Sequence, residues 1–178
     1  MSDRLKAESM HQTASDLMRP DPVTIPPEAT LAELERELVE HRVGGLPVMQ
    51  KGRLIGFVTR TDIVRKLCLE QALAEATAAP DQEVTGAQGA VESELGAIGA
   101  QLGHRLANIR VEDVMHRKVW SVDSHEPIEN VAKKMLTLRI HHLPVFEGER
   151  LAGIISTFDL ARFVAEQTSA LTPELVAT

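Results

Sequence analysis

Hydrophobic and polar positions in the first part of the chain predict a strand, a helix, two strands and a second helix. The first helix is expected to start at Thr30, because Thr30 and Glu33 form a capping-box pattern and apolar residues then recur at helical spacing. The pair Gly44-Gly45 is expected to end it. Two apolar stretches around a glycine-containing turn predict a hairpin. The expected positions are a strand at 23–25, the first helix from 30, strands at 46–49 and 54–58, and a second helix starting within 59–62.

The same series of elements occurs again 97 residues further along the chain. Residues 14–65 overlay 111–162 without a gap, and the shared positions include a D-x-M opening, an L-P-V strand and a closing aspartate. The second copy predicts a helix with Pro127 in its first turn and a hairpin of 143–146 and 151–155 around Gly148. One copy is small for an independent core, so the two are expected to pack sheet against sheet.

The segment between the copies is longer than a connection requires, because compact domains usually join elements with about 4–6 residues. Residues 66–79 are expected to extend the closing helix, 80–89 to form a loop and 91–110 to form an amphipathic helix. Glycines at 96, 99 and 103 would let that helix pack closely, either on its own module or on a partner. The expected divisions are an N-terminal extension 1–13, a first repeat 14–65, a helical insertion 66–110, a second repeat 111–163 and a C-terminal tail 164–178.

Composition narrows the classes of protein. The 178 residues include 19 basic and 26 acidic side chains, a formal net charge of −7, with 3% aromatic residues and no tyrosine. Proteins that hold nucleic acid need basic stripes and stacking rings, so a nucleic-acid partner is not expected. No apolar stretch approaches the ~20 residues that cross a bilayer, and residues 1–13 are polar, so neither a membrane span nor a secretory signal is expected. With one cysteine, Cys68, the protein is expected to be cytoplasmic.

The order of motifs resembles the cystathionine-beta-synthase (CBS) domain. Each copy has the D-[LV]-M opening, the h-P-V strand, the hairpin and the closing G-h-h-[TS]-x-x-D. Two tandem copies resemble a CBS pair, or Bateman module. The resemblance implies an α+β fold of two βαββα repeats with pseudo-twofold symmetry, plus the inserted helical segment. It also implies adenosine-type ligands in two clefts between the repeats, and a homodimer.

The closing motif places a hydroxyl and, three residues later, a carboxylate at a strand-to-helix turn. A carboxylate can accept both hydrogens of a vicinal diol, so these aspartates suit a ribose, with the hydroxyl and free helix N–H groups beside it. A glycine in the preceding strand would allow close approach. The motif matches the ribose-binding motif of the CBS family; the alternative is a plain helix capping box. The expected ligand residues are Gly56, Thr59 and Asp62 in the first copy and Gly153, Ser156 and Asp159 in the second.

Two further places are expected to contact the ligand. In the family, a hydroxyl or backbone group of the first strand lies near the nucleoside. The two copies also differ before the L-P-V strand, where Gly44-Gly45 in one faces a histidine pair in the other. In the gamma subunit of AMP-activated protein kinase, which is similar in architecture, basic side chains there reach phosphates. The residues concerned are Thr24, Ile25, Ser121, Val122, His141 and His142, with Arg42, Arg60 and Arg139 as additional phosphate contacts.

The histidines would donate hydrogen bonds and, near pH 6.5 and below, carry positive charge. This predicts one phosphate-tolerant cleft and one weaker or differently selective cleft. The alternative is a solvated histidine pair. A metal site is not expected, since no further Cys, His or Asp cluster lies nearby in the sequence.

We therefore expect a stand-alone regulatory module that senses AMP, ADP or ATP and signals occupancy to an unknown effector protein. No tightly bound cofactor and no catalysis are expected: the nucleophile-base pattern at 121–125 lies on one strand, whereas catalytic triads combine separate elements. One alternative is a ligand-independent dimerisation or scaffold protein. Another is S-adenosylmethionine as the ligand, because it carries the same diol.

Overall fold

The computed structural model describes residues 12–77 and 103–169, and in it the chain divides into two compact units. One unit, here the Asp159 unit, joins Met1–Pro22 to Trp120–Thr178. The other, the Asp62 unit, comprises Val23–Val119. Each unit therefore combines the D-x-M segment of one sequence copy with the hairpin and helices of the other copy. We call these exchanged pieces, residues 13–22 and 110–119, the opening segments.

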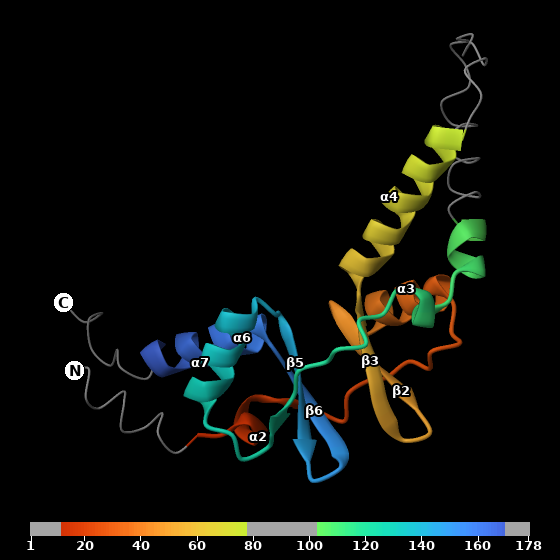
Figure 1. Ribbon diagram of the computed structural model, residues 1–178. Helices are drawn as coiled ribbons and strands as arrows, with labels where there is room; N and C mark the ends of the chain where they lie inside the picture. Colours follow the sequence, from red (N-terminus) through yellow and green to blue (C-terminus); the bar gives the residue numbers. More distant parts are fainter. Residues whose placement is uncertain (1–11, 78–102, 170–178) are drawn as a thin grey trace, which may run out of the picture. The chain divides into compact units, whose positions relative to one another are not determined.

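The Asp159 unit contains a four-stranded sheet in the order β1-β6-β5-β4. Its central strands, β5 and β6, are labelled in Figure 1. Strand β1, from the opening segment, pairs antiparallel with β6, β6 pairs antiparallel with β5, and β5 pairs parallel with β4. The apolar faces of its helices and strands form one core that includes Leu17, Val131, Met135, Leu143 and Ile155. Its elements are α2 (Ala14–Leu17), β1 (Arg19–Pro20), β4 (Val122–Asp123), α6 (Ile128–Leu138), β5 (His142–Glu147), β6 (Arg150–Ser156) and α7 (Thr157–Ser169).

The Asp62 unit has a two-stranded sheet, β2-β3, extended on both sides by single bridges. Ile25 bridges Val48 in parallel, and His116 of the opening segment bridges Phe57 antiparallel. A separate apolar core includes Leu34. The elements are α3 (Leu31–Glu40), β2 (Gly45–Gln50), β3 (Arg53–Thr59), α4 (Arg60–Thr77) and the 3-10 helix η1 (Val111–Asp113).

The two units repeat the same strand register. The bridge of His116 to Phe57 is equivalent to the pairing of Arg19 with Ile154. His116 lies 97 residues after Arg19, and Phe57 lies 97 residues before Ile154, so the two partners exchange their order in the chain. Ile25 with Val48 corresponds to Val122 with Val145, where both residues lie 97 positions further along and no exchange occurs. Both hairpins also shift register at the same place, after Val48 and after Val145. The duplication seen in the sequence is therefore a duplication of backbone pairing, which confirms the α+β fold of two repeats.

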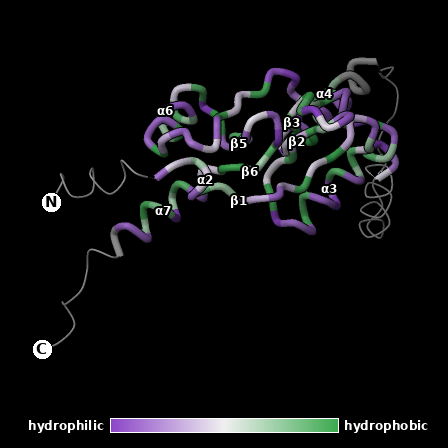
Figure 2. The backbone as a smooth tube through the Cα atoms, turned by 90° about the horizontal axis from the view of Figure 1, so that it is seen from below, coloured by the Kyte–Doolittle hydropathy of each residue, from purple (hydrophilic) through white to green (hydrophobic). Residues whose placement is uncertain are grey.

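The helix starts agree with the sequence better than the helix ends. Thr30 caps α3 as expected: its hydroxyl accepts from Glu33 N at 3.2 Å, and the Glu33 carboxylate accepts from Thr30 N at 2.7 Å. In α6, Pro127 is the N-cap and not part of the first turn. Both helices are amphipathic, with hydrophobic and hydrophilic positions alternating along them (Figure 2).

The prediction that Gly44-Gly45 ends the first helix is wrong. Helix α3 ends at Glu40, and the chain turns at Arg42, which has a left-handed φ of 52°. Gly45 already lies in β2, where a Cβ would come within 2.7 Å of the Phe57 ring and 2.9 Å of the Thr59 methyl group. The glycine is needed for strand packing, and an arginine makes the turn.

Only part of the insertion lies within the described residues. Helix α4 continues to Thr77, in agreement with the expected extension, whereas the expected loop 80–89, most of the helix 91–110, Gly96 and Gly99 lie outside. Residues 103–108 are helical, and Leu106 and Ile109 pack on the core of the Asp62 unit. Among the described residues, a Cβ at Gly103 would meet nothing within 4 Å. Among the described residues, no helix combines the length and apolar character that a membrane crossing needs.

Candidate functional site

Each unit buries one aspartate in the first turn of its closing helix. Asp62 in α4 is 3% exposed and Asp159 in α7 is 1% exposed. Both follow the last residue of a hairpin strand, Thr59 or Ser156, by three positions. A carboxylate this buried must be held by hydrogen bonds or ion pairs, because an unpaired buried charge is very costly. The partners of these two side chains therefore define the site.

The inner oxygen, Oδ2, is bound by the local turn. Oδ2 of Asp159 accepts from the backbone N of Ser156 at 2.9 Å and from the Ser156 hydroxyl, which itself accepts from Asp159 N at 3.3 Å. Oδ2 of Asp62 accepts from Thr59 N at 2.9 Å and from the Thr59 hydroxyl at 2.7 Å. These are the contacts that the capping-box alternative predicts. Capping accounts for Oδ2 and leaves Oδ1 as the outward-facing oxygen.

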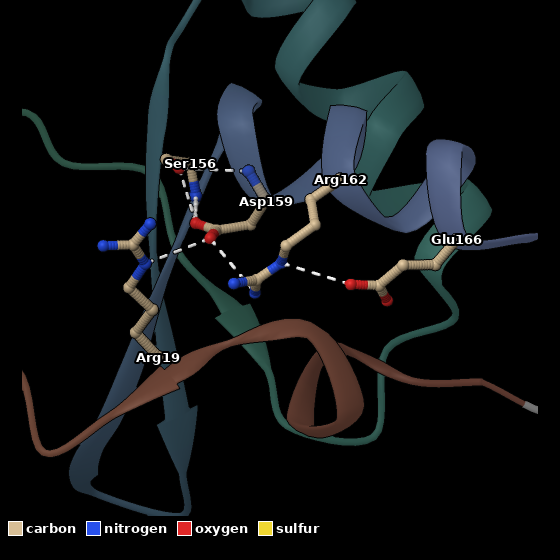
Figure 3. A network of polar contacts seen from close by, with 5 residues as sticks. All are labelled: Arg19, Ser156, Asp159, Arg162 and Glu166. Atoms are coloured by element: carbon tan, nitrogen blue, oxygen red, sulfur yellow. Dashed lines mark hydrogen bonds and ion pairs between the residues drawn. The ribbon is translucent and has the colours of Figure 1, made fainter.

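The outer oxygen, Oδ1, faces cations in both units. In the Asp159 unit, Nε of Arg19 lies 3.0 Å from Oδ1, and Nη2 of Arg162 lies 3.5 Å from it (Figure 3). Arg162 also reaches Glu166, with its Nε 3.8 Å from Oε1 (Figure 3). Arg19 comes from the opening segment, so the site joins parts of the chain 140 residues apart.

The Asp62 unit has the same arrangement with a different side chain. Nη1 of Arg65 lies 3.1 Å from Oδ1 of Asp62, and Nε2 of His116 lies 2.9 Å from the same oxygen. Because a carboxylate only accepts hydrogen bonds, the ring nitrogen is the donor. His116 and Arg19 both follow the methionine of a D-x-M motif, 97 residues apart. The sequence analysis missed both residues; their equal offset and their place beside that motif could have identified them.

Electrostatics favour an ionised Asp159. Burial alone would raise the pKa of Asp159, but the hydrogen bonds from the Ser156 hydroxyl and N–H and from the Arg19 guanidinium outweigh it and hold the pKa below its usual value. The carboxylate is therefore charged at neutral pH, as an acceptor for a diol has to be.

The strand glycines accommodate the opening segments. A Cβ at Gly56 would lie 2.5 Å from Sδ of Met115, and a Cβ at Gly153 would lie 2.6 Å from Sδ of Met18. The glycines were expected to allow close approach of a ligand; the group that approaches them in the structure is the methionine of D-x-M. Glycine and methionine are thus a matched pair that places Arg19 and His116 at the aspartates.

The first-strand residues divide into buried apolar positions and more accessible hydroxyls. Ile25 and Val122 are buried in the two cores, whereas Thr24 is exposed and Ser121 is partly buried. Ile25 N donates to Pro47 O and Ile25 O accepts from Met49 N, both at 3.0 Å. These backbone groups are therefore engaged in strand pairing, which disfavours the expected backbone contact from Ile25 to a nucleoside.

The histidine pair lies at the start of β5. His141 is exposed, and His142 is partly buried and pairs across the hairpin with Ser156. Burial lowers the pKa of His142 and the neighbouring His141 lowers it further, while Asp159 opposes them. His142 therefore gains positive charge only at a lower pH than an ordinary histidine. The prediction that a positively charged histidine pair attracts phosphate is therefore weaker. The two copies still differ here, because one has two histidines where the other has two glycines.

Three arginines were expected as additional phosphate contacts, and they differ in their local structure. Nη2 of Arg60 donates to Leu38 O at 3.2 Å, so Arg60 satisfies a carbonyl near the end of α3. Arg42 and Arg139 both adopt left-handed backbone, with φ of 52° and 53°, where the two helices end. Glycine or asparagine is the usual residue in that conformation.

The nucleophile-base pattern at 121–125 does not form a triad. Nδ1 of His125 lies 2.9 Å from Oδ1 of Asp123 and 3.2 Å from Oγ of Ser124. In a triad the orienting carboxylate and the nucleophile engage opposite ring nitrogens. Here both contacts fall on the same nitrogen, and they are local turn contacts.

Two segments of the chain, 14–68 and 111–166, match the family model of the CBS domain. The chain belongs to the CBS domain family. Together the two domains make a tandem CBS pair, or Bateman module. Uncharacterized protein MJ1225 of Methanocaldococcus jannaschii is 26% identical over 156 residues, which cover 87% of this chain and 48% of that protein. Some other curated relatives are enzymes, and the match spans 13% to 22% of their length.

Solved CBS structures have the same fold. A signal-transduction protein with CBS domains from Burkholderia ambifaria superposes with a TM-score of 0.65 at 22% identity, covering 93% of this chain and 100% of that one. The CBS domain pair of protein MJ0100 superposes with a TM-score of 0.60 at 22% identity, covering 88% of this chain and 98% of the other. That structure is a complex with 5′-methylthioadenosine and S-adenosyl-L-methionine.

Proposed function

We propose that this CBS pair is a regulatory module that binds an adenosine nucleotide of the AMP, ADP or ATP class at Asp62 and Asp159. The observation that supports this most is the buried carboxylate, with an adjacent hydroxyl, at the first turn of each closing helix. Such a group accepts the two hydrogens of a ribose diol. The ligands of the MJ0100 pair carry that diol too.

The left-handed arginines favour a phosphate-bearing ligand. A residue other than glycine in this conformation costs roughly 1–2 kcal/mol. Asp21 and Lys51 also adopt it, but among the described residues only the arginines are the same residue at equivalent places in both units. Arg42 and Arg139 occupy equivalent positions, and both side chains are exposed. Arginine binds phosphate in a bidentate geometry. S-adenosylmethionine has no phosphate and would leave this feature unexplained.

We expect another protein to respond to ligand binding. We propose a homodimer in the cytoplasm that passes ligand occupancy to an effector protein, with no catalysis of its own and no tightly bound cofactor. The competing function is a scaffold whose aspartates only cap helices, and the contacts of Oδ2 favour it as a specific alternative.

Thermal shift and calorimetry with AMP, ADP, ATP, NAD and S-adenosylmethionine separate these functions. At about 100-fold excess over its dissociation constant, a ligand stabilises the native state by ~2.7 kcal/mol. For a chain of this size that is roughly 5–10 °C in Tm. Asp62→Asn and Asp159→Asn should each remove one site, and Asp21→Asn, at an exposed aspartate with left-handed backbone, is the matched control.

The outcomes are distinct. Binding of a nucleotide that depends on either motif aspartate supports the proposal, and a response to S-adenosylmethionine alone replaces the ligand class. A well-folded protein that responds to none of the five ligands supports the scaffold.

A further inference from the structure

The outer oxygen of each motif aspartate is occupied by a side chain that the closing motif does not contain. In the Asp159 unit this side chain is Arg19, and in the Asp62 unit it is His116. Both come from the opening segments and occupy equivalent positions on the edge of a hairpin. The two sites are thus built alike and differ in the chemistry of one group.

A ribose diol has to compete with these groups. A carboxylate offers about four acceptor positions. In Asp62, Oδ2 holds two donors from Thr59 and Oδ1 holds Arg65 and His116, so all four are used. In Asp159, Oδ2 is bound by Ser156, and Oδ1 by Arg19 with Arg162 further away. A diol can bind only where one of the cations on Oδ1 moves aside.

We infer that the residue after the D-x-M methionine, Arg19 or His116, sets how readily each aspartate accepts a ribose diol; this rests on the proposed function. The side chains are 50% and 58% exposed, so both can turn into solvent. Arginine offers several donors in a rigid, always charged fork, whereas histidine reaches Asp62 through one ring nitrogen. Arg19 therefore holds its carboxylate more firmly than His116 does.

The direction of the effect follows from the groups around His116. From α4 it is faced by Asp62 and Arg65. Strand β3, which pairs with it at Phe57, has its single charge at the far end, and the opening segment carries Arg110, Glu112, Asp113, Arg117 and Lys118. Asp62 is the contact partner, so a diol has to displace a histidine at Asp62 but an arginine at Asp159. Adenosine should therefore bind more tightly at Asp62.

The test uses adenosine, which has the diol and no phosphate, and 2′-deoxyadenosine, which lacks the diol. Each site is isolated by Asp159→Asn or Asp62→Asn, and calorimetry is run on both variants at neutral pH. Adenosine should bind the Asp62 site roughly tenfold more tightly than the Asp159 site, the effect of one stronger charge-assisted hydrogen bond at Asp159.

Reciprocal variants provide the matched controls. His116→Arg should weaken adenosine binding at the Asp62 site, and Arg19→His should strengthen it at the Asp159 site. Neither variant disturbs a core, because both side chains are half exposed. 2′-Deoxyadenosine should show little of either effect.

Two failures are distinguishable. If adenosine binds but the reciprocal variants leave both affinities unchanged, the inference is overturned and the proposed function stands. If adenosine and the nucleotides bind to no variant, the proposed function fails and the inference fails with it.

Discussion

The Asp159 unit and the Asp62 unit share backbone pairing and capping but differ in the groups around the aspartate. Arg19 and His142 approach Asp159, whereas His116 and a glycine, Gly45, take the corresponding places at Asp62. The duplicated units have kept the same strand pairing and helix capping, whereas the groups that contact Oδ1 of the carboxylate have diverged. The two units of one CBS pair thus keep the same backbone pairing while their motif aspartates have different cationic partners.

The largest expected effect comes from the glycine beneath each opening segment. In Gly153→Ala the new Cβ would lie 2.6 Å from Met18 Sδ and 2.7 Å from the backbone oxygen of Arg19, which cannot move easily. In Gly56→Ala the backbone oxygen of His116 is further away, at 3.2 Å. Overpacking costs about 1–3 kcal/mol. We expect Gly153→Ala near the upper end and Gly56→Ala near the lower, measured by urea unfolding.

Double variants test the source of each cost. Gly56→Ala should cost much less in a Met115→Ala background than in the natural sequence, because the obstacle there is mainly a side chain. Gly153→Ala should cost nearly as much with Met18→Ala as without it, because the Arg19 carbonyl remains. Equal coupling in both units would contradict the difference.

The next effect concerns the charge of Asp159 and its dependence on pH. Its pKa is lowered in the folded state, so its ionised form contributes stability above the unfolded value of about 3.9, and this contribution is lost as the pH falls through the folded pKa. Asp159→Asn should therefore cost about 1–2 kcal/mol at neutral pH and progressively less below about pH 4. Urea unfolding at a series of pH values measures it; a cost that does not shrink in acid would show that the charge is not the source.

The N-caps of α3 and α6 also differ between the two units. Thr30 and Glu33 make a complete capping box, whereas Pro127 provides no side-chain cap. Thr30→Ala should cost about 1 kcal/mol. The double variant Pro127→Thr with Asn130→Glu places the same box at α6 and should recover about half of that amount in stability. Chemical denaturation of both variants gives the values, and a loss in the double variant would show that Pro127 fixes the entry of the chain.

The sequence predicted the fold well because its signals are local and occur twice. Hairpins, the Thr30 cap and the amphipathic helices follow from spacing within a few residues, and the offset of 97 residues links the copies. The exchange of opening segments could not be predicted, because it depends on which strand each D-x-M segment pairs with, and the residues it brings together are 140 and 54 positions apart. For the same reason Arg19 and His116 were missed, although the sequence singled out Asp62 and Asp159. The turn at Arg42 was missed because it uses an arginine where the pattern favours glycine.

The smallest effect tests the two left-handed arginines. Arg42→Gly and Arg139→Gly should each raise stability by roughly 0.5–1 kcal/mol, because glycine adopts a φ near 52° or 53° without the clash of a Cβ. If the arginines contact phosphate, the same variants should weaken AMP binding and leave adenosine binding unchanged. Urea unfolding and calorimetry with both ligands separate the two roles. More stability with an unaltered preference for AMP over adenosine would show that the arginines are not phosphate ligands, and that the difference between the sites lies at the aspartates alone.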